Sequence, residues 1–158
     1  MCGIIGVLRR PNLDPAPDLE PLIADVEFAA ATLAKTIKLD PASVQDIAKR
    51  LDRVSSSLAN VPGVEALVTD VHGRAELSAA VDHVYSAVSD FDNALEALPA
   101  AEIEPFTAAL VRVRDAAWSL QKDRIPAAEY TDRLLGGLTN RSAIDVMNQV
   151  VIALRALD

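Results

Sequence analysis

The residue with the clearest capacity for chemistry is Cys2, the only cysteine of the chain, which directly follows Met1. Because the Cys2 side chain is small, we expect Met1 to be removed, leaving Cys2 as the N-terminal residue. A thiol and a free α-amine would then lie on one residue. The α-amine, with a pKa near ~8, can take the thiol proton directly or through a water, so Cys2 is a candidate nucleophile with its own base.

The residues around Cys2 resemble the start of a known enzyme family. The run Met1-Cys2-Gly3-Ile4-Ile5-Gly6-Val7 is similar to the opening of class II glutamine amidotransferases, which are N-terminal-nucleophile hydrolases. The run Val151–Asp158 resembles the end of the helix that precedes the family's Arg-Gly-x-Asp-Ser loop. The most similar members are the isomerising glutamine–fructose-6-phosphate aminotransferases (glucosamine-6-phosphate synthases), although amidophosphoribosyltransferases and asparagine synthetases also begin Cys-Gly-Ile.

The resemblance implies a transferase that attacks the side-chain amide of glutamine with the Cys2 thiol, releases ammonia and hydrolyses the thioester to glutamate. Ammonia would pass to an acceptor, which is fructose 6-phosphate in the most similar enzymes. Glutamine and a sugar phosphate are therefore the implied partners. The chain has no Arg-Gly and no Asn-Gly pair, so the family's glutamine-carboxylate loop and oxyanion donors are missing.

An oxyanion-hole donor contributes on the order of 10²–10³-fold to kcat. We therefore expect these residues to be inactive alone and to form the N-terminal portion of a longer enzyme. A reading frame that continues past Asp158 into Arg-Gly-x-Asp-Ser would agree with this hypothesis. The alternative is a non-catalytic helical bundle that binds a partner or oligomerises, with a coincidental cysteine at its start.

Composition narrows the other possible functions. The 158 residues carry a net charge of −8, and such an acidic balance disfavours binding to nucleic acid and to anionic membranes. No apolar run approaches the ~18 residues of a membrane-spanning helix. A single cysteine forms no internal disulfide, so we expect a cytoplasmic protein. Apolar residues make up 51% and aromatic residues only 4%, which suits closely packed helices.

Apolar residues recur at three- and four-residue steps through most of the chain, which predicts amphipathic helices. The expected fold is mainly α, an antiparallel bundle of about five helices preceded by one short β-strand at Gly3–Leu8. Breaks are expected at Asn60–Gly63, at His72-Gly73, between Pro99 and Pro105, and at Gly136-Gly137. The long helices are expected over 19–37, 40–58, 77–98, 106–120 and 142–158, with shorter pieces at 64–71 and 126–135.

These elements suggest an insertion within an enzyme domain. Residues 1–10 are interpreted as the catalytic strand, 11–21 as a Pro-rich linker and 22–141 as a helical insertion bundle. Residues 142–158 form a last helix that suits either the bundle or the first helix of the amidotransferase core. A bundle that folds from local contacts and brings its ends together is tolerated inside an enzyme core. We expect it to act as a lid, a regulatory surface or the contact of a homo-oligomer.

The remaining polar and aromatic candidates receive structural interpretations. His72 is expected in a solvated loop and His83 on the surface of the third long helix. Since no carboxylate shares ligand spacing with both histidines, we expect no metal site and no cofactor. Trp118 is expected to pack in the core or at the bundle edge, and the serines at 55–57 lack a partner for catalysis.

Overall fold

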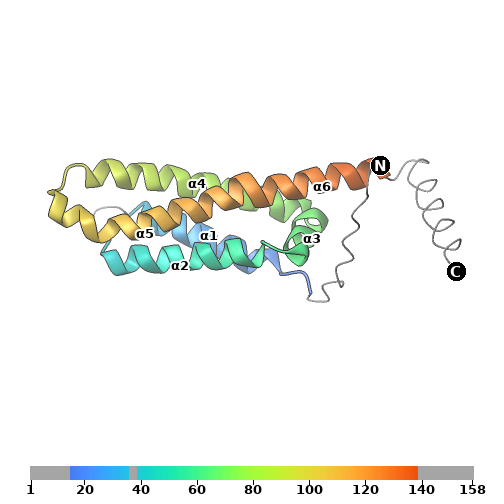
Figure 1. Ribbon diagram of the computed structural model, residues 1–158, viewed down its shortest axis with the longest axis horizontal. Coiled ribbons are helices and arrows are strands. Elements are labelled where there is room, and N and C mark those ends of the chain that lie inside the picture. Colours follow the sequence, from blue (N-terminus) through green and yellow to red (C-terminus); the bar gives the residue numbers. More distant parts are fainter. Residues whose placement is uncertain (1–14, 36–38, 139–158) are drawn as a thin grey trace, which may run out of the picture.

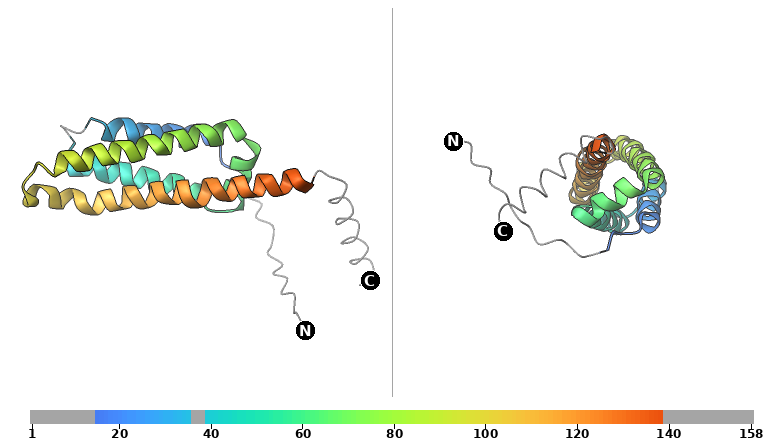
Figure 2. Two further views of the ribbon diagram at one scale, coloured as in Figure 1. Left: turned by 90° about the horizontal axis from the view of Figure 1, so that it is seen from above. Right: turned by 90° about the vertical axis from the view of Figure 1, so that its right-hand side faces the viewer.

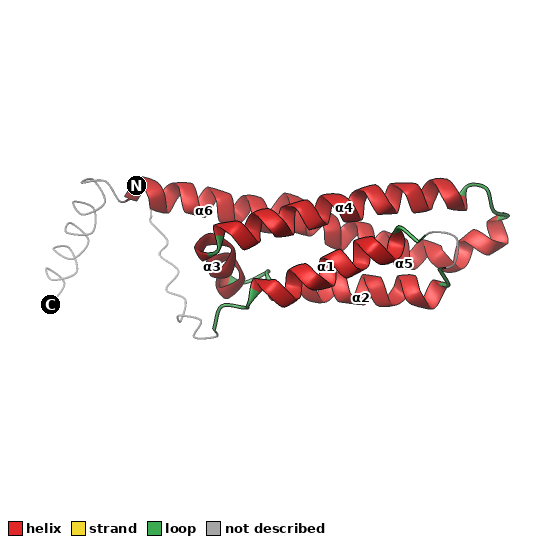
Figure 3. Ribbon diagram, turned by 180° about the vertical axis from the view of Figure 1, so that it is seen from behind, coloured by secondary structure: helices red, strands yellow, loops and turns green. Residues whose placement is uncertain are grey.

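The computed structural model describes residues 15–35 and 39–138, and within these ranges it contains helices and no strand (Figures 1 and 3). The helix η2 is a π-helical turn between α5 and α6, so α5, η2 and α6 form one continuous rod. The described residues thus make five rods, which confirms the expected mainly-α bundle. The predicted strand lies outside the described residues. The elements are α1 (Leu19–Leu33), α2 (Pro41–Ser57), α3 (Val61–Thr69), α4 (Val71–Leu95), α5 (Ala100–Ser119), η2 (Leu120–Arg124) and α6 (Ile125–Leu138).

The four long rods lie side by side, and the short helix α3 crosses one end of them (Figure 2). We call this the α3 end. The chain reverses direction from each long rod to the next, as expected. The most extensive contacts, however, join α1 to α4 and α2 to α5, and the members of each pair run in the same direction (Figure 1). The reason is that α3 carries the chain across the bundle end and sets α4 beside α1.

The core is formed by the apolar stripes that the sequence predicts. Alanines are buried where α1 meets α4, and small side chains let two helices approach closely. Phe91 and Phe106 form an edge-to-face pair with centroids 5.7 Å apart between α4 and α5. No polar or charged residue is buried among the described residues. Leu98, expected on the stripe of the third long helix, is instead 40% exposed because α4 ends at Leu95. The predicted stripe residues confirmed as buried are Leu19, Ile23, Val26, Ala30, Leu33, Val44, Ile47, Leu51, Val54, Leu58, Leu77, Val81, Val84, Val88, Phe91, Leu95, Phe106, Leu110, Val113, Ala117 and Leu120.

Aspartates cap three of the helices at their N-termini. Asp18 accepts a hydrogen bond from the Glu20 N–H, Asp40 from the Ser43 N–H and Asp70 from the Gly73 N–H. Such caps satisfy N–H groups that have no partner within the helix. The start predicted at Asp40-Pro41 is confirmed.

The two expected breaks at the α3 end are present but lie a few residues earlier than expected: α2 ends at Ser57 before α3 begins at Val61, and α3 ends at Thr69 before α4 begins at Val71. Asn60 is the N-cap of α3, and Pro62 is within its first turn, where a missing N–H costs no hydrogen bond. His72 lies in the first turn of α4, where its side chain is exposed and 3.3 Å from the Glu76 carboxylate. It is solvated, as expected, but it belongs to a helix.

Two other prolines also lie inside helices. The expected linker ended at Pro21, yet α1 begins at Leu19, so this proline occupies the first helical turn. The turn expected between Pro99 and Pro105 is confirmed as far as Pro99 only, since α4 ends at Leu95 and α5 begins at Ala100. Pro99 is the N-cap of α5, and Pro105 lies inside that helix.

The predicted separation between the fourth helix and the piece after it is wrong as well. At η2 the Ile125 N–H bonds to the Leu120 carbonyl, five residues back. This wider turn accommodates Pro126, which lacks an N–H and would clash with a regular α-helical turn. The expected break at Gly136-Gly137 lies within α6. No described glycine has a positive φ, so neither adopts the left-handed conformation that ends many helices.

Candidate functional site

The predicted nucleophile, Cys2, lies outside the described residues, and so does the expected helix 142–158. The structure describes the bundle that separates these two segments. The structure therefore shows at which end of the bundle the chain enters and leaves, and which grooves lie on the surface of the bundle.

Both ends of the bundle's chain lie at the α3 end. A Cβ added at Gly73, in the first turn of α4, would lie 3.1 Å from Leu19 Cδ1, so the first residue of α1 touches the start of α4. Arg74 then joins the start of α4 to α6 through Asp132, with an Nη2–Oδ2 distance of 2.9 Å. Its Nη1 also donates to the Leu67 carbonyl of α3 at 3.1 Å. The chain therefore enters and leaves the bundle at one end (Figure 1).

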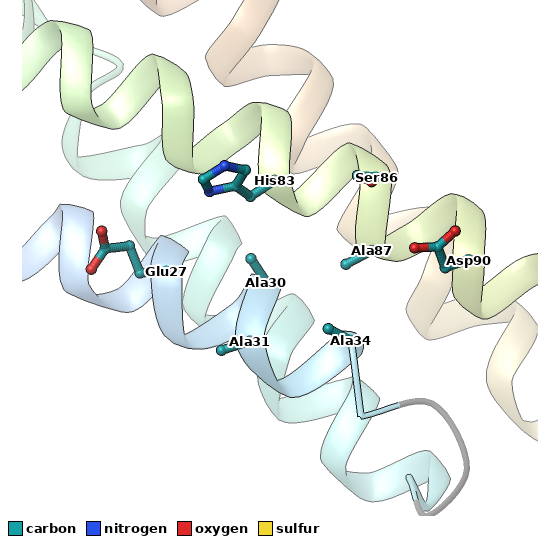
Figure 4. Close-up of a pocket in the computed structure, with 8 residues that line it drawn as sticks. All are labelled: Glu27, Ala30, Ala31, Ala34, His83, Ser86, Ala87 and Asp90. Carbon is teal, nitrogen blue, oxygen red and sulfur yellow. The ribbon is translucent and has the colours of Figure 1, made fainter.

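A groove between α1 and α4 brings together an imidazole and two carboxylates. In Figure 4, Glu27 of α1 and His83 and Asp90 of α4 surround a floor of alanine side chains. The groove has a volume of about 400 Å³ and is open to solvent. An imidazole and carboxylates can transfer protons, but no cysteine lies among the groove's residues. His83 is exposed, as the sequence predicts.

The surface between α4 and α5 holds Trp118, whose side chain is 53% exposed. It lies at the bundle edge, one of the two predicted positions, and not in the core. Trp118 lines a cavity of about 330 Å³ with Tyr85. Burial raises the pKa of Tyr85, and the nearby Asp82 carboxylate raises it further. The Tyr85 hydroxyl is buried and has no hydrogen-bond partner within the described part of the chain.

A third groove, of about 590 Å³, lies at the α3 end between α3 and α6. We call it the α3 groove. Val61, Val64 and Val68 line it from α3, and Thr131 lines it from α6. Sequence reasoning missed it because Asn60–Gly63 was interpreted as a break. The signal that reveals it is the three- and four-residue spacing of these valines, on the side of α3 opposite its buried residues.

No group of metal-ligating side chains occurs in residues 15–35 and 39–138. No helix in these ranges is both long and apolar enough to cross a membrane. No protein family, curated protein or solved structure matches the chain. The resemblance around Cys2 therefore stays a prediction from the sequence.

Proposed function

We propose that this chain is the N-terminal part of a class II glutamine amidotransferase that uses Cys2 to release ammonia from glutamine. The acceptor that the resemblance favours is fructose 6-phosphate, which would make the enzyme a step in amino-sugar synthesis. The observation that carries the proposal is the Met-Cys-Gly-Ile-Ile-Gly start. It places a small, processable thiol residue where an α-amine can serve as its base.

The chemistry follows from that residue. The α-amine takes the thiol proton, and the Cys2 sulfur attacks the amide carbon of the glutamine side chain. The amide nitrogen then leaves as ammonia with the returned proton, and a thioester remains. Water adds to the thioester carbonyl, which releases glutamate and restores the thiol. Donors for the oxyanion would come from residues beyond this chain, as would the acceptor site.

The geometry of the bundle supports this proposal through the position of its ends. An inserted unit must take the chain from a host domain and return it nearby, and both the start of α1 and α6 lie at the α3 end. The bundle also has an apolar core of its own, with no charged residue buried among those described. A unit with these properties can fold inside an enzyme without rearranging the host.

A second candidate is a non-catalytic bundle that binds a partner or forms a homo-oligomer. The observation that favours it is the exposure of large apolar side chains on the long rods. Phe28 of α1 is 50% exposed, Val111 of α5 is 45% exposed and Trp118 is 53% exposed. Val111 and Trp118 are seven residues apart and therefore lie on one face of α5, whereas a single exposed side chain such as Phe28 is common on protein surfaces.

A diazo-ketone analogue of glutamine tests the first candidate on the full protein that contains this chain. We expect one equivalent of the analogue on Cys2, located by peptide mass spectrometry, and no labelling of the Cys2→Ala variant. A matched control inserts a lysine between Met1 and Cys2, which blocks removal of Met1 while keeping the thiol. It should also stay unlabelled. Labelling that persists in Cys2→Ala would exclude the proposed chemistry.

A further inference from the structure

The helix α3 is apolar on two opposite faces although it lies on the outside of the bundle. Its inner face buries Gly63, Ala66 and Leu67 against the core. Its outer face carries Val61, which is 64% exposed, and the half-buried Val64 and Val68, of which Val68 also packs against the core. Glu65 and Thr69 are exposed beside these valines, so the outer face combines apolar surface with a polar border. The outer face of α3 therefore leaves apolar surface, mainly that of Val61, exposed to solvent within the described part of the chain.

The shape of this surface fits a helix. The three valines repeat at three and four residues and form one wall of the α3 groove, which also includes Ala59. Polar side chains lie at its margin: Asn60, Glu65, Thr69 and Thr131. An apolar groove with a polar margin is the usual seat of an amphipathic helix, which inserts its apolar residues at the same spacing.

We propose that the α3 groove is the docking site of residues 142–158 of the same chain. This segment carries the apolar residues Ile144, Met147, Val151, Leu154 and Leu157, again at three- and four-residue steps. It would cover the outer face of α3 as a helix packed against the bundle, and under the proposed function the same segment can be the first helix of the amidotransferase core. The proposal does not depend on Cys2 or on amidotransferase activity.

The length of the chain and the position of α6 favour this occupant. Thr131 of α6 lines the groove, and α6 ends at Leu138. Seven further residues of helix extend the chain by only about 10 Å. A connection over residues 139–141 then has the short length that commonly joins neighbouring helices. A segment tethered this closely reaches an effective concentration in the millimolar range, which free partners rarely match.

Hydrogen–deuterium exchange of the full chain tests the docking. We expect amides of residues 144–157 to be protected, and Val61→Asp and Val64→Asp each to reduce that protection at least tenfold. Both variants place a carboxylate in the groove near the N-terminus of α3, where a negative charge favours the helix. The matched control is Val111→Asp, a half-exposed valine on α5, which should leave that protection unchanged. Retained protection in the core of α1 and α4 shows that each variant is folded.

A disulfide cross-link distinguishes residues 142–158 of the same chain from a second copy of the chain as the occupant of the α3 groove. In a Cys2→Ser background, Val64→Cys and Val151→Cys should form an intramolecular disulfide that intact mass detects in the monomer. A disulfide found only between two chains would assign the groove to a second copy and overturn the proposal. Unprotected amides at 144–157 in the unaltered chain, or equal protection in Val64→Asp, would overturn it as well.

Discussion

Arg74, in the first turns of α4, connects three helices at the α3 end through hydrogen bonds of its side chain. Its side chain is only 11% exposed, donates to Asp132 of α6 at 2.9 Å and donates to the Leu67 carbonyl of α3 at 3.1 Å. Each partner belongs to a different helix. The guanidinium can serve both because it carries several donors in a fixed planar arrangement. Arg74 therefore fixes α3 and α6 relative to the start of α4.

Replacing Arg74 by methionine should lower the free energy of unfolding by about 2 kcal/mol, the size expected for hydrogen bonds to a largely buried charged group. The matched control is Arg112→Met, which removes an exposed ion pair with Asp52 and should cost less than about 1 kcal/mol. Urea denaturation followed by circular dichroism measures both values. Equal losses in the two variants would contradict the role given to Arg74.

The helix cap at Asp40 should make the stability of the bundle depend on pH, and a single substitution can test this contribution. It accepts the Ser43 N–H at 2.8 Å and the Ser43 hydroxyl at 3.2 Å. These hydrogen bonds favour the carboxylate and hold the pKa of Asp40 below its ordinary value of 3.8. Because the folded-state pKa is depressed, the stabilisation is present above 3.8 and disappears as the pH falls through the folded-state pKa.

The Asp40→Asn variant should therefore lose less stability in acid than the unaltered chain. Asparagine caps a helix about as well as aspartate does, but it does not titrate. Thermal unfolding measured from neutral pH down through the acidic range should give Tm curves that lie together near neutral pH and separate as the pH falls, with the unaltered chain the lower. Parallel Tm curves would show that the Asp40 cap does not titrate in this range.

At the scale of elements, the contact between α2 and α3 depends on the absence of a side chain at Gly63. A Cβ added there would lie 2.4 Å from Leu58 Cα and 2.6 Å from the Leu58 carbonyl carbon. Both are backbone atoms that cannot rotate away. Gly63 thus allows α3 to start directly against the end of α2.

Gly63→Ala should accordingly destabilise the bundle by about 1–3 kcal/mol, as overpacking does elsewhere. Gly136→Ala is the counterpart, because a Cβ at Gly136 meets nothing within 4 Å and alanine is the better helix former by about 0.8–1 kcal/mol. It should raise the free energy of unfolding. Chemical denaturation of both variants gives the comparison, and a stabilising Gly63→Ala would contradict the packing at the α2–α3 junction.

The helical stripes could be predicted from the sequence because burial in a bundle repeats with the helical period. The stripes of α2, α4 and α5 show this, since Val54, Val84 and Val113 are each predicted to face the core and are fully buried. Prolines were harder to interpret. Pro62 in a first turn and Pro126 after a π turn leave a helix intact, and the surrounding sequence alone does not separate these positions from true breaks.

At the scale of the whole molecule, the parallel pairing of α1 with α4 and of α2 with α5 could not be predicted from the stripes. It depends on α3, which moves the chain across the bundle end before α4 begins. The α1–α4 groove and the α3 groove likewise arise only when helices distant in sequence meet. The candidate nucleophile, in contrast, stays a prediction from the sequence alone, because its chemistry needs only one residue and a processed end.

The bundle receives and returns the chain at the α3 end, so residues on either side of it can belong to one domain. Under the proposed function that domain is the amidotransferase core, and Cys2 is its nucleophile. The bundle would then be a self-contained insertion beside the catalytic domain.

The central claim is that the thiol and the base reside on one N-terminal residue. The most direct measurement is the N-terminal residue of the mature protein isolated from its own cells, determined by intact mass and N-terminal sequencing. We predict that Cys2 is the first residue and that Met1 is absent. A mature protein that begins with Met1 would contradict the claim, because the Cys2 thiol would then have no α-amine of its own.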